Sequence, residues 1–251
     1  MAELRTAGTL TRIGATERRD LWWVEPALVF VGLGIFIVYA TLRAFKGNFY
    51  AWGPYLSPFY SPLIDPLHHW WPFSPALLIL TGPLGFRTTC YYYRKAYYRA
   101  FFWDPPACAV GEARHNYKGE AGFPLILQNV HRYFFYLSFV YLVFLWRDAV
   151  RAFDWQGHFG MGLGTLVLLV NVTLLTTYTL SCHSCRHLVG GNLDCFSCAK
   201  FGGGRLGLWR RVTALNERHM LIAWMSLFCV GFADLYVRLV SCGAFHDPRF
   251  F

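Results

Sequence analysis

Charged residues are almost missing from five long stretches of this chain. Residues 26–42, 70–86 and 159–182 carry none, and residues 121–146 carry only Arg132. A helix rises about 1.5 Å per residue, so a bilayer core of about 30 Å requires about 20 apolar residues. The pattern therefore predicts five transmembrane helices, over about residues 24–44, 70–93, 122–147, 159–182 and 215–241.

The composition supports an all-α membrane protein. Of the 251 residues, 55% are hydrophobic and only 15% are charged. Soluble domains carry about a quarter charged residues, and a disordered chain would combine few apolar residues with high charge. Because the sequence has neither an internal repeat nor a low-complexity tract, we expect a single membrane domain, a five-helix bundle covering residues 1–251.

The basic residues predict an orientation in the membrane. Segments 1–23, 87–120 and 183–218 hold sixteen Lys and Arg residues, whereas the three alternate segments hold six. Basic residues near the ends of spans stay in the cytoplasm. The N-terminus is therefore expected in the cytoplasm and the C-terminus outside, with cytoplasmic loops over 94–120 and 183–214. The net charge of +9 is then explained by basic residues in the cytoplasmic segments, and no nucleic-acid partner is expected.

The second cytoplasmic loop contains the clearest chemical signal. Two CxxC pairs lie there, with two histidines interleaved in the first pair. A reducing compartment disfavours disulfides, so paired CxxC motifs indicate a metal site. Thiolates alone suit zinc or an iron–sulfur cluster, and added imidazoles permit a Rieske-type [2Fe–2S] centre, which we favour over zinc. The candidate ligands in this loop are Cys182, His183, Cys185, His187, Cys195 and Cys198.

Two further histidines lie within predicted spans, at a depth close to that of Cys182. His131 and His219 could bind a haem, complete the cluster or donate to a quinone carbonyl; the ordinary alternative is a hydrogen-bonded structural role. Ionisable residues inside a membrane are rare and usually face the interior of the bundle. Arg132 and Tyr136 are candidates for binding a cofactor, although Arg132 would also suit a lipid phosphate.

Several of these motifs resemble one known family. "TCYYYRKAYYRAFFWDPPACAVGE", "FPLILQNVHRYFFY", "SCHSCRH" and "LNERHM" followed by "AW" look like the single-polypeptide, five-helix membrane anchor of bacterial succinate dehydrogenase/fumarate reductase, respiratory complex II. The resemblance covers roughly residues 84–245.

The resemblance implies an anchor without independent catalysis in the bacterial cytoplasmic membrane. It would dock an iron–sulfur subunit and an FAD flavoprotein and pass electrons to a quinone, either menaquinone or ubiquinone. The resemblance does not fix the direction of the reaction, and a higher oligomer is compatible with it.

Anchors of this family often hold haem b between paired histidines, which His131 and His219 could match. The Cys/His loop is not needed for haem and favours a Rieske-type cluster. Two alternatives stay open: a haem b anchor with structural zinc in the loop, and a non-redox membrane scaffold or transporter.

Overall fold

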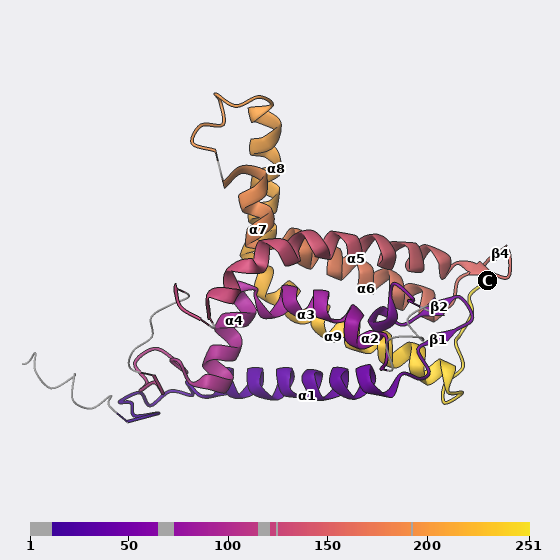
Figure 1. The fold of residues 1–251 in the computed structure, drawn as a ribbon, viewed down its shortest axis with the longest axis horizontal. Helices are drawn as coiled ribbons and strands as arrows, with labels where there is room; N and C mark the ends of the chain where they lie inside the picture. Colours follow the sequence, from indigo (N-terminus) through magenta and orange to yellow (C-terminus); the bar gives the residue numbers. More distant parts are fainter. Residues whose placement is uncertain (1–11, 65–72, 115–120, 124, 192) are drawn as a thin grey trace, which may run out of the picture. The chain divides into compact units, whose positions relative to one another are not determined.

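The computed structural model describes residues 12–64, 73–114, 121–123, 125–191 and 193–251 (Figure 1). Its internal contacts divide the chain into two compact units. One consists of Met1–Val38 and Arg87–Val130, and the other of Tyr39–Phe86 and His131–Phe251. Each unit is described by itself below. The organisation as a single domain stays a prediction.

Helices dominate both units, and the strands among the described residues form two short hairpins. In chain order the elements are α1 (Val24–Lys46), β1 (Ala51–Trp52), β2 (Tyr55–Leu56), η1 (Pro58–Tyr60), α2 (Ala76–Ile79), α3 (Thr81–Thr88), α4 (Tyr91–Tyr97), η3 (Tyr98–Phe102), η5 (Leu125–Val130), α5 (His131–Arg151), β3 (Asp154–Trp155), β4 (His158–Phe159), α6 (Leu163–Leu180), α7 (His183–Arg186), η6 (His187–Gly191), α8 (Gly202–Glu217) and α9 (His219–Ser241).

Four of the described helical segments are long and apolar enough to cross a membrane. They are Val24–Lys46, Ile126–Arg151, Leu163–Leu180 and His219–Ser241. Each corresponds to a span expected from the sequence, so the assignment to the all-α membrane class is confirmed. The expected cytoplasmic loops contain helices of their own, namely α4, α7 and α8. Residues 115–120 of the first loop lie outside the described residues.

The second expected span, 70–93, is divided into shorter pieces. Its apolar helical part is Ala76–Thr88, which at about 1.5 Å per residue is about 20 Å long and shorter than a bilayer core. Leu80 separates α2 from α3, and a new helix, α4, begins at Tyr91 after Cys90 adopts an extended conformation. Residues 70–72 lie outside the described residues. A count of five spans is therefore not confirmed.

Two glycines allow α3 to approach α5 closely. A Cβ atom added at Gly82 would lie 2.4 Å from the ring of Tyr141, and one added at Gly85 would lie 2.2 Å from the ring of Phe134. Small residues at helix interfaces let membrane helices pack at short distance. This approach brings Phe86, near the end of α3, onto the start of α5.

Helix α6 packs against both α5 and α9 (Figure 1). A hydrophobic core forms around the start of α6, where Tyr55 packs with Leu168 and Val237. Asp247, in the segment after α9, accepts a hydrogen bond of 2.8 Å from the backbone N–H of Gly164 in the first turn of α6. It thereby caps that helix, because the first N–H groups of a helix have no partner within it.

Two tyrosines also hold Asp247 in place. The Tyr55 hydroxyl donates to Asp247 at 2.8 Å, and the Tyr236 hydroxyl donates to the other carboxylate oxygen. Burial raises the pKa of Tyr55 to about 12, so its hydroxyl keeps the proton that it donates. Phe250 and Phe251 form backbone hydrogen bonds with Met161, which fixes the last residues beside the start of α6.

A buried ion pair joins the end of α1 to α9 within the larger unit. Arg43 Nε lies 3.0 Å from Asp234 Oδ2, and the two side chains are 2% and 0% exposed. Tyr39 donates to the same carboxylate at 2.6 Å, and Ser57 donates to its other oxygen. A buried charge needs a partner and hydrogen bonds to be tolerated, and Asp234 has both.

In the smaller unit, α4 continues directly into η3, which packs on the first part of α1. Phe101 lies 4.7 Å from Phe30, measured between ring centroids, and Trp103 lies edge-on to Trp22 at 6.5 Å. The segment before α1 pairs with the loop after η3 through backbone hydrogen bonds between residues 14–15 and Gly111.

Candidate functional site

Three helix ends meet at one end of the larger unit. Helix α5 begins at His131, α9 begins at His219, and α6 ends just before Ser181 and Cys182. Because α6 runs antiparallel to both neighbours, its C-terminal end lies beside their N-terminal ends. The chain then turns at Cys182 into the short helix α7, which carries Cys185. The sequence predicted that His131 and His219 lie at a depth close to that of Cys182. They do so because each of the three residues lies at or next to one of these helix ends.

A thiol and an imidazole are in direct contact at this site. His131 Nε2 lies 3.0 Å from Cys182 Sγ. The two residues are 4% and 1% exposed. Phe86 stacks on the imidazole of His131 at 5.0 Å with an angle of 3° between the rings. Both side chains are therefore fixed and shielded from water.

The second histidine is held by a serine. Ser181 Oγ donates to the carbonyl of Tyr178 at 2.8 Å and lies 2.7 Å from His219 Nδ1. A hydroxyl has one proton, so Ser181 accepts from the Nδ1–H group of His219. The lone pair of this imidazole is then on Nε2, the nitrogen that can bind a metal.

Aromatic rings join the two histidines into one cluster. Tyr178 stacks on His219 at 5.1 Å and meets Phe86 edge-on at 5.4 Å, and Phe86 in turn stacks on His131. Phe86, Tyr178 and Ser181 were missed by sequence reasoning. The available signal was sequence spacing, because Tyr178 lies four residues before Cys182, a separation that puts two residues of a helix on one face.

Cys185 completes a set of four buried donor residues. It follows Cys182 by three residues and is 5% exposed. Burial raises the pKa of its thiol, as expected for a cysteine in apolar surroundings. The buried set thus contains two thiols, from Cys182 and Cys185, and two imidazoles, from His131 and His219.

The other ligand candidates lie elsewhere. His183 is exposed, and His187 Nδ1 lies 3.3 Å from a guanidinium nitrogen of Arg132. Tyr136 is exposed on α5, one turn after Arg132 and on the same face. Arg132 is exposed as well. Both cofactor-binding candidates therefore face away from the buried histidines.

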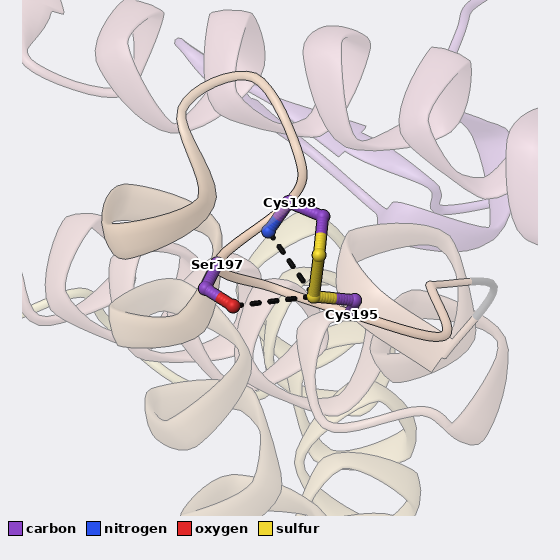
Figure 2. The surroundings of a disulfide bond; sticks show 3 residues. All are labelled: Cys195, Ser197 and Cys198. Carbon is purple, nitrogen blue, oxygen red and sulfur yellow. Dashed lines mark hydrogen bonds between the residues drawn. A yellow bond between two sulfur atoms is a disulfide. The ribbon is translucent and has the colours of Figure 1, made fainter.

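The second CxxC pair forms a disulfide (Figure 2). Cys195 and Cys198 are bonded to each other, and their Cα atoms are 5.4 Å apart. The backbone N–H of Cys198 also lies 3.2 Å from Cys195 Sγ. The sequence led us to expect two metal ligands in a compartment that disfavours disulfides. While the sulfurs are bonded to each other, neither is a thiolate available to a metal.

Across the described ranges, no three His, Cys, Asp or Glu side chains converge closely enough to hold one metal ion. The donor chemistry nevertheless fits a mixed sulfur–nitrogen centre. Two thiols and two imidazoles are the ligands of a Rieske-type [2Fe–2S] cluster, and one thiol and one imidazole of the buried set already touch.

Comparison with solved structures places this fold beside a respiratory assembly. The chain matches a chain of "Mycobacterium smegmatis Sdh1 complex in the apo form" with a TM-score of 0.85 and 45% sequence identity, over 94% of each chain. No curated protein matches it significantly. Residues 24–243 match the family described as "Actinobacterial succinate dehydrogenase subunit SdhC". The chain therefore belongs to the actinobacterial SdhC family, whose members are membrane-anchor subunits of succinate dehydrogenase, respiratory complex II.

Proposed function

We propose that this anchor carries electrons between a docked iron–sulfur subunit and a membrane quinone through a Rieske-type [2Fe–2S] centre of its own. Cys182, Cys185, His131 and His219 would hold that centre. The observation that carries the proposal is the contact between His131 and Cys182, both buried where the helix ends meet. A haem needs only imidazole ligands, so a buried thiol against a buried imidazole favours a cluster with mixed ligands.

The residues of this chain supply position, polarity and the exclusion of water. When bound, a Rieske-type centre exchanges single electrons at a potential raised by its imidazole ligands. Ser181 fixes the tautomer of His219, and the Asn216 amide donates to the Ser181 carbonyl at 2.7 Å, which fixes the turn between α6 and α7. Phe86 and Tyr178 cover the imidazoles with apolar surface.

The quinone is proposed to bind beside the exposed face of α5. Arg132 and Tyr136 present a guanidinium and a phenol on one side of that helix, and both are hydrogen-bond donors suited to a quinone carbonyl. We infer a multi-pass topology in the bacterial cytoplasmic membrane, with the N-terminus and the two basic loops in the cytoplasm. The iron–sulfur subunit, joined to the FAD flavoprotein, would dock on that side, and succinate chemistry would take place in the flavoprotein.

Metal content of the intact complex tests the proposal. Wild type is expected to contain two more iron and two more acid-labile sulfide atoms than the soluble subunits account for, with a Rieske-type electron paramagnetic resonance signal after reduction. Cys182→Ser should lose both. Cys242→Ser is the matched control, because Cys242 is an exposed free cysteine. An unchanged iron content in Cys182→Ser would contradict the proposal.

A haem b bound by His131 and His219 is the second candidate. It is favoured by one observation, the burial of both imidazoles at the same end of the unit. A haem-type optical spectrum, with zinc and no additional acid-labile sulfide, would identify it and would assign the cysteines a structural role.

A further inference from the structure

A charged cavity in the smaller unit has no role in the function proposed above. It has a volume of about 380 Å³ and lies between the helix formed by α4 and η3 and the loop that follows them. The helix contributes Tyr91, Arg94, Lys95 and Arg99, and the loop contributes Asp104 and Glu112.

The charges in this cavity are separated by sign. Three cations lie on the helix side and two carboxylates on the loop side. Arg94 is 7% exposed, and its guanidinium lies 4.3 Å from the centre of the Tyr91 ring. The side chain of Asp104 is 4% exposed, at 3.8 Å from Arg114. A ligand with a single negative group would be repelled by the carboxylates, whereas a ligand carrying both charges would be attracted to both sides.

The loop side of the cavity is held in a fixed position. Gly111 donates to the carbonyl of Ala15 and accepts from the N–H of Gly14, each at 2.8 Å, and Ala113 donates to the carbonyl of Trp103 at 2.9 Å. These bonds tie the loop to the segment before α1. The two carboxylates are therefore held opposite the cations before any ligand binds, which lowers the entropic cost of binding.

The depth of the cavity points to a lipid. Phe101, at the end of η3, packs on Phe30, which is six residues into α1 and thus about 9 Å along it. Trp103 pairs with Trp22 just before α1 begins, and tryptophans favour the headgroup layer of a bilayer. Tyr91, which lines the cavity, is exposed, and so are Phe102 and Trp103, which precede the cavity residue Asp104 in the chain. In the topology proposed above, on which this inference rests, the cavity then lies at the level where phospholipid headgroups meet acyl chains.

We propose that this cavity binds the headgroup of a phosphatidylethanolamine, a phospholipid that carries a phosphate and a primary amine. The phosphate lies toward Arg94, Lys95 and Arg99, and the ammonium group lies toward Asp104 and Glu112. A docked protein segment is the competing occupant. It accounts less well for exposed aromatic residues at headgroup depth, which a lipid covers with its acyl chains.

Lipid retention by the intact complex tests the proposal. The complex is purified with extensive detergent washing, and its phospholipids are extracted and quantified by mass spectrometry. Wild type is expected to retain one phosphatidylethanolamine per anchor. Lys95→Gln combined with Arg99→Gln should lower its affinity for added lipid roughly thirtyfold, since each of the two basic residues contributes on the order of 1 kcal/mol near a lipid surface. Arg210→Gln, at an exposed arginine of α8, is the matched control.

The choice of lipid separates the two halves of the site. Glu112→Gln should weaken retention of phosphatidylethanolamine and leave retention of phosphatidylglycerol unchanged or increased. Three results would overturn the proposal: equal retention in wild type and in the cavity variants, preference of wild type for phosphatidylglycerol, or cross-linking of Lys95 to another subunit with no lipid retained. Displacement of the lipid by equimolar soluble glycerophosphoethanolamine would also overturn it, by showing a site for a free headgroup.

Discussion

Asp234 carries a carboxylate inside an apolar helix, and the three side chains that donate to it come from α1 and from the loop that follows. Arg43 is as deeply buried as its partner and also donates to the Asn48 carbonyl at 2.9 Å. The sequence alone shows only that Asp234 interrupts an apolar stretch. The partner could not be identified, because Arg43 is nearly two hundred residues away and also suits an interfacial position.

Loss of the Asp234 carboxylate should destabilise the protein strongly. Asp234→Ala leaves the Arg43 guanidinium buried without its counter-charge, at a cost of about 3–5 kcal/mol. Thermal unfolding of the detergent-solubilised complex measures the effect. Asp194→Ala, at an exposed carboxylate, should leave the transition unchanged. Replacing both partners by apolar residues, Arg43→Met with Asp234→Leu, should recover most of the loss, and failure to do so would argue for a role beyond pairing.

Ser181 is expected to affect metal binding through its contact with His219. In Ser181→Ala the Nδ1–H group loses its acceptor, and loss of such a supporting hydrogen bond typically lowers metal affinity about 10–100-fold. The variant should therefore lose iron to a chelator faster than wild type while retaining the docked subunits. Ser226→Ala is the control, because Ser226 is equally buried on α9 and donates to the Ala223 carbonyl of its own helix. Equal iron loss in the two variants would remove Ser181 from the site.

At the level of single residues, the sequence identified the rare groups and missed the common ones. Cysteine and histidine at a membrane boundary are conspicuous, so Cys182, His131 and His219 could be proposed together. Phe86 and Tyr178 could not, since aromatic residues are frequent throughout this chain. The disulfide of Cys195 with Cys198 was not expected, because CxxC spacing suits either a disulfide or a metal and the loop was assigned to a reducing compartment.

At the level of whole elements, long uninterrupted apolar runs predicted the membrane helices well. Helix α1 occupies the expected range almost completely, and α6 and α9 begin within four residues of theirs. The segment from 70 to 93 was the exception, because hydropathy counts apolar residues without registering where the backbone turns. Helix α8 was not predicted either, since its three initial glycines are typical of a loop.

The close approach of α3 to α5 can be tested at a single glycine. Gly85→Ala places a methyl group against the ring of Phe134, and such overpacking typically costs about 1–3 kcal/mol. Gly207→Ala in α8 is the matched control, because nothing lies within 4 Å of the added Cβ, and it should be neutral or stabilise by up to about 1 kcal/mol. Thermal unfolding of both variants compares them, and equal transitions would contradict the tight contact.

At the scale of the whole molecule, the distribution of basic residues predicts an orientation across the membrane, which helix packing cannot determine. A bundle of helices is equally well packed in either orientation across a bilayer, whereas basic residues are retained on the cytoplasmic side. The membrane class could therefore be derived from composition and pattern. The way in which distant segments touch, such as the pairing of residues 14–15 with Gly111, depends on packing that no local pattern encodes.

Reporter fusions test the proposed orientation. Alkaline phosphatase fused after Phe251 should be active, because that enzyme folds only outside the cytoplasm. Green fluorescent protein exported to the same side by the secretory pathway should not fluoresce. A fusion within Gly203–Gly204 should show the opposite pattern. A phosphatase signal from the loop would place the cysteines on the wrong side for electron delivery.

The capping of α6 by Asp247 also has a consequence for biogenesis. A ribosome releases Gly164 long before it releases Asp247, and chains fold from the N-terminal side as they emerge. While α8 and α9 are still being synthesised, α6 enters the bilayer without the Asp247 carboxylate that caps the backbone N–H groups of its first turn. The final tightening of the bundle must therefore follow synthesis of Asp247, so translational arrest before that residue should leave a protease-sensitive intermediate that is inserted but not fully packed.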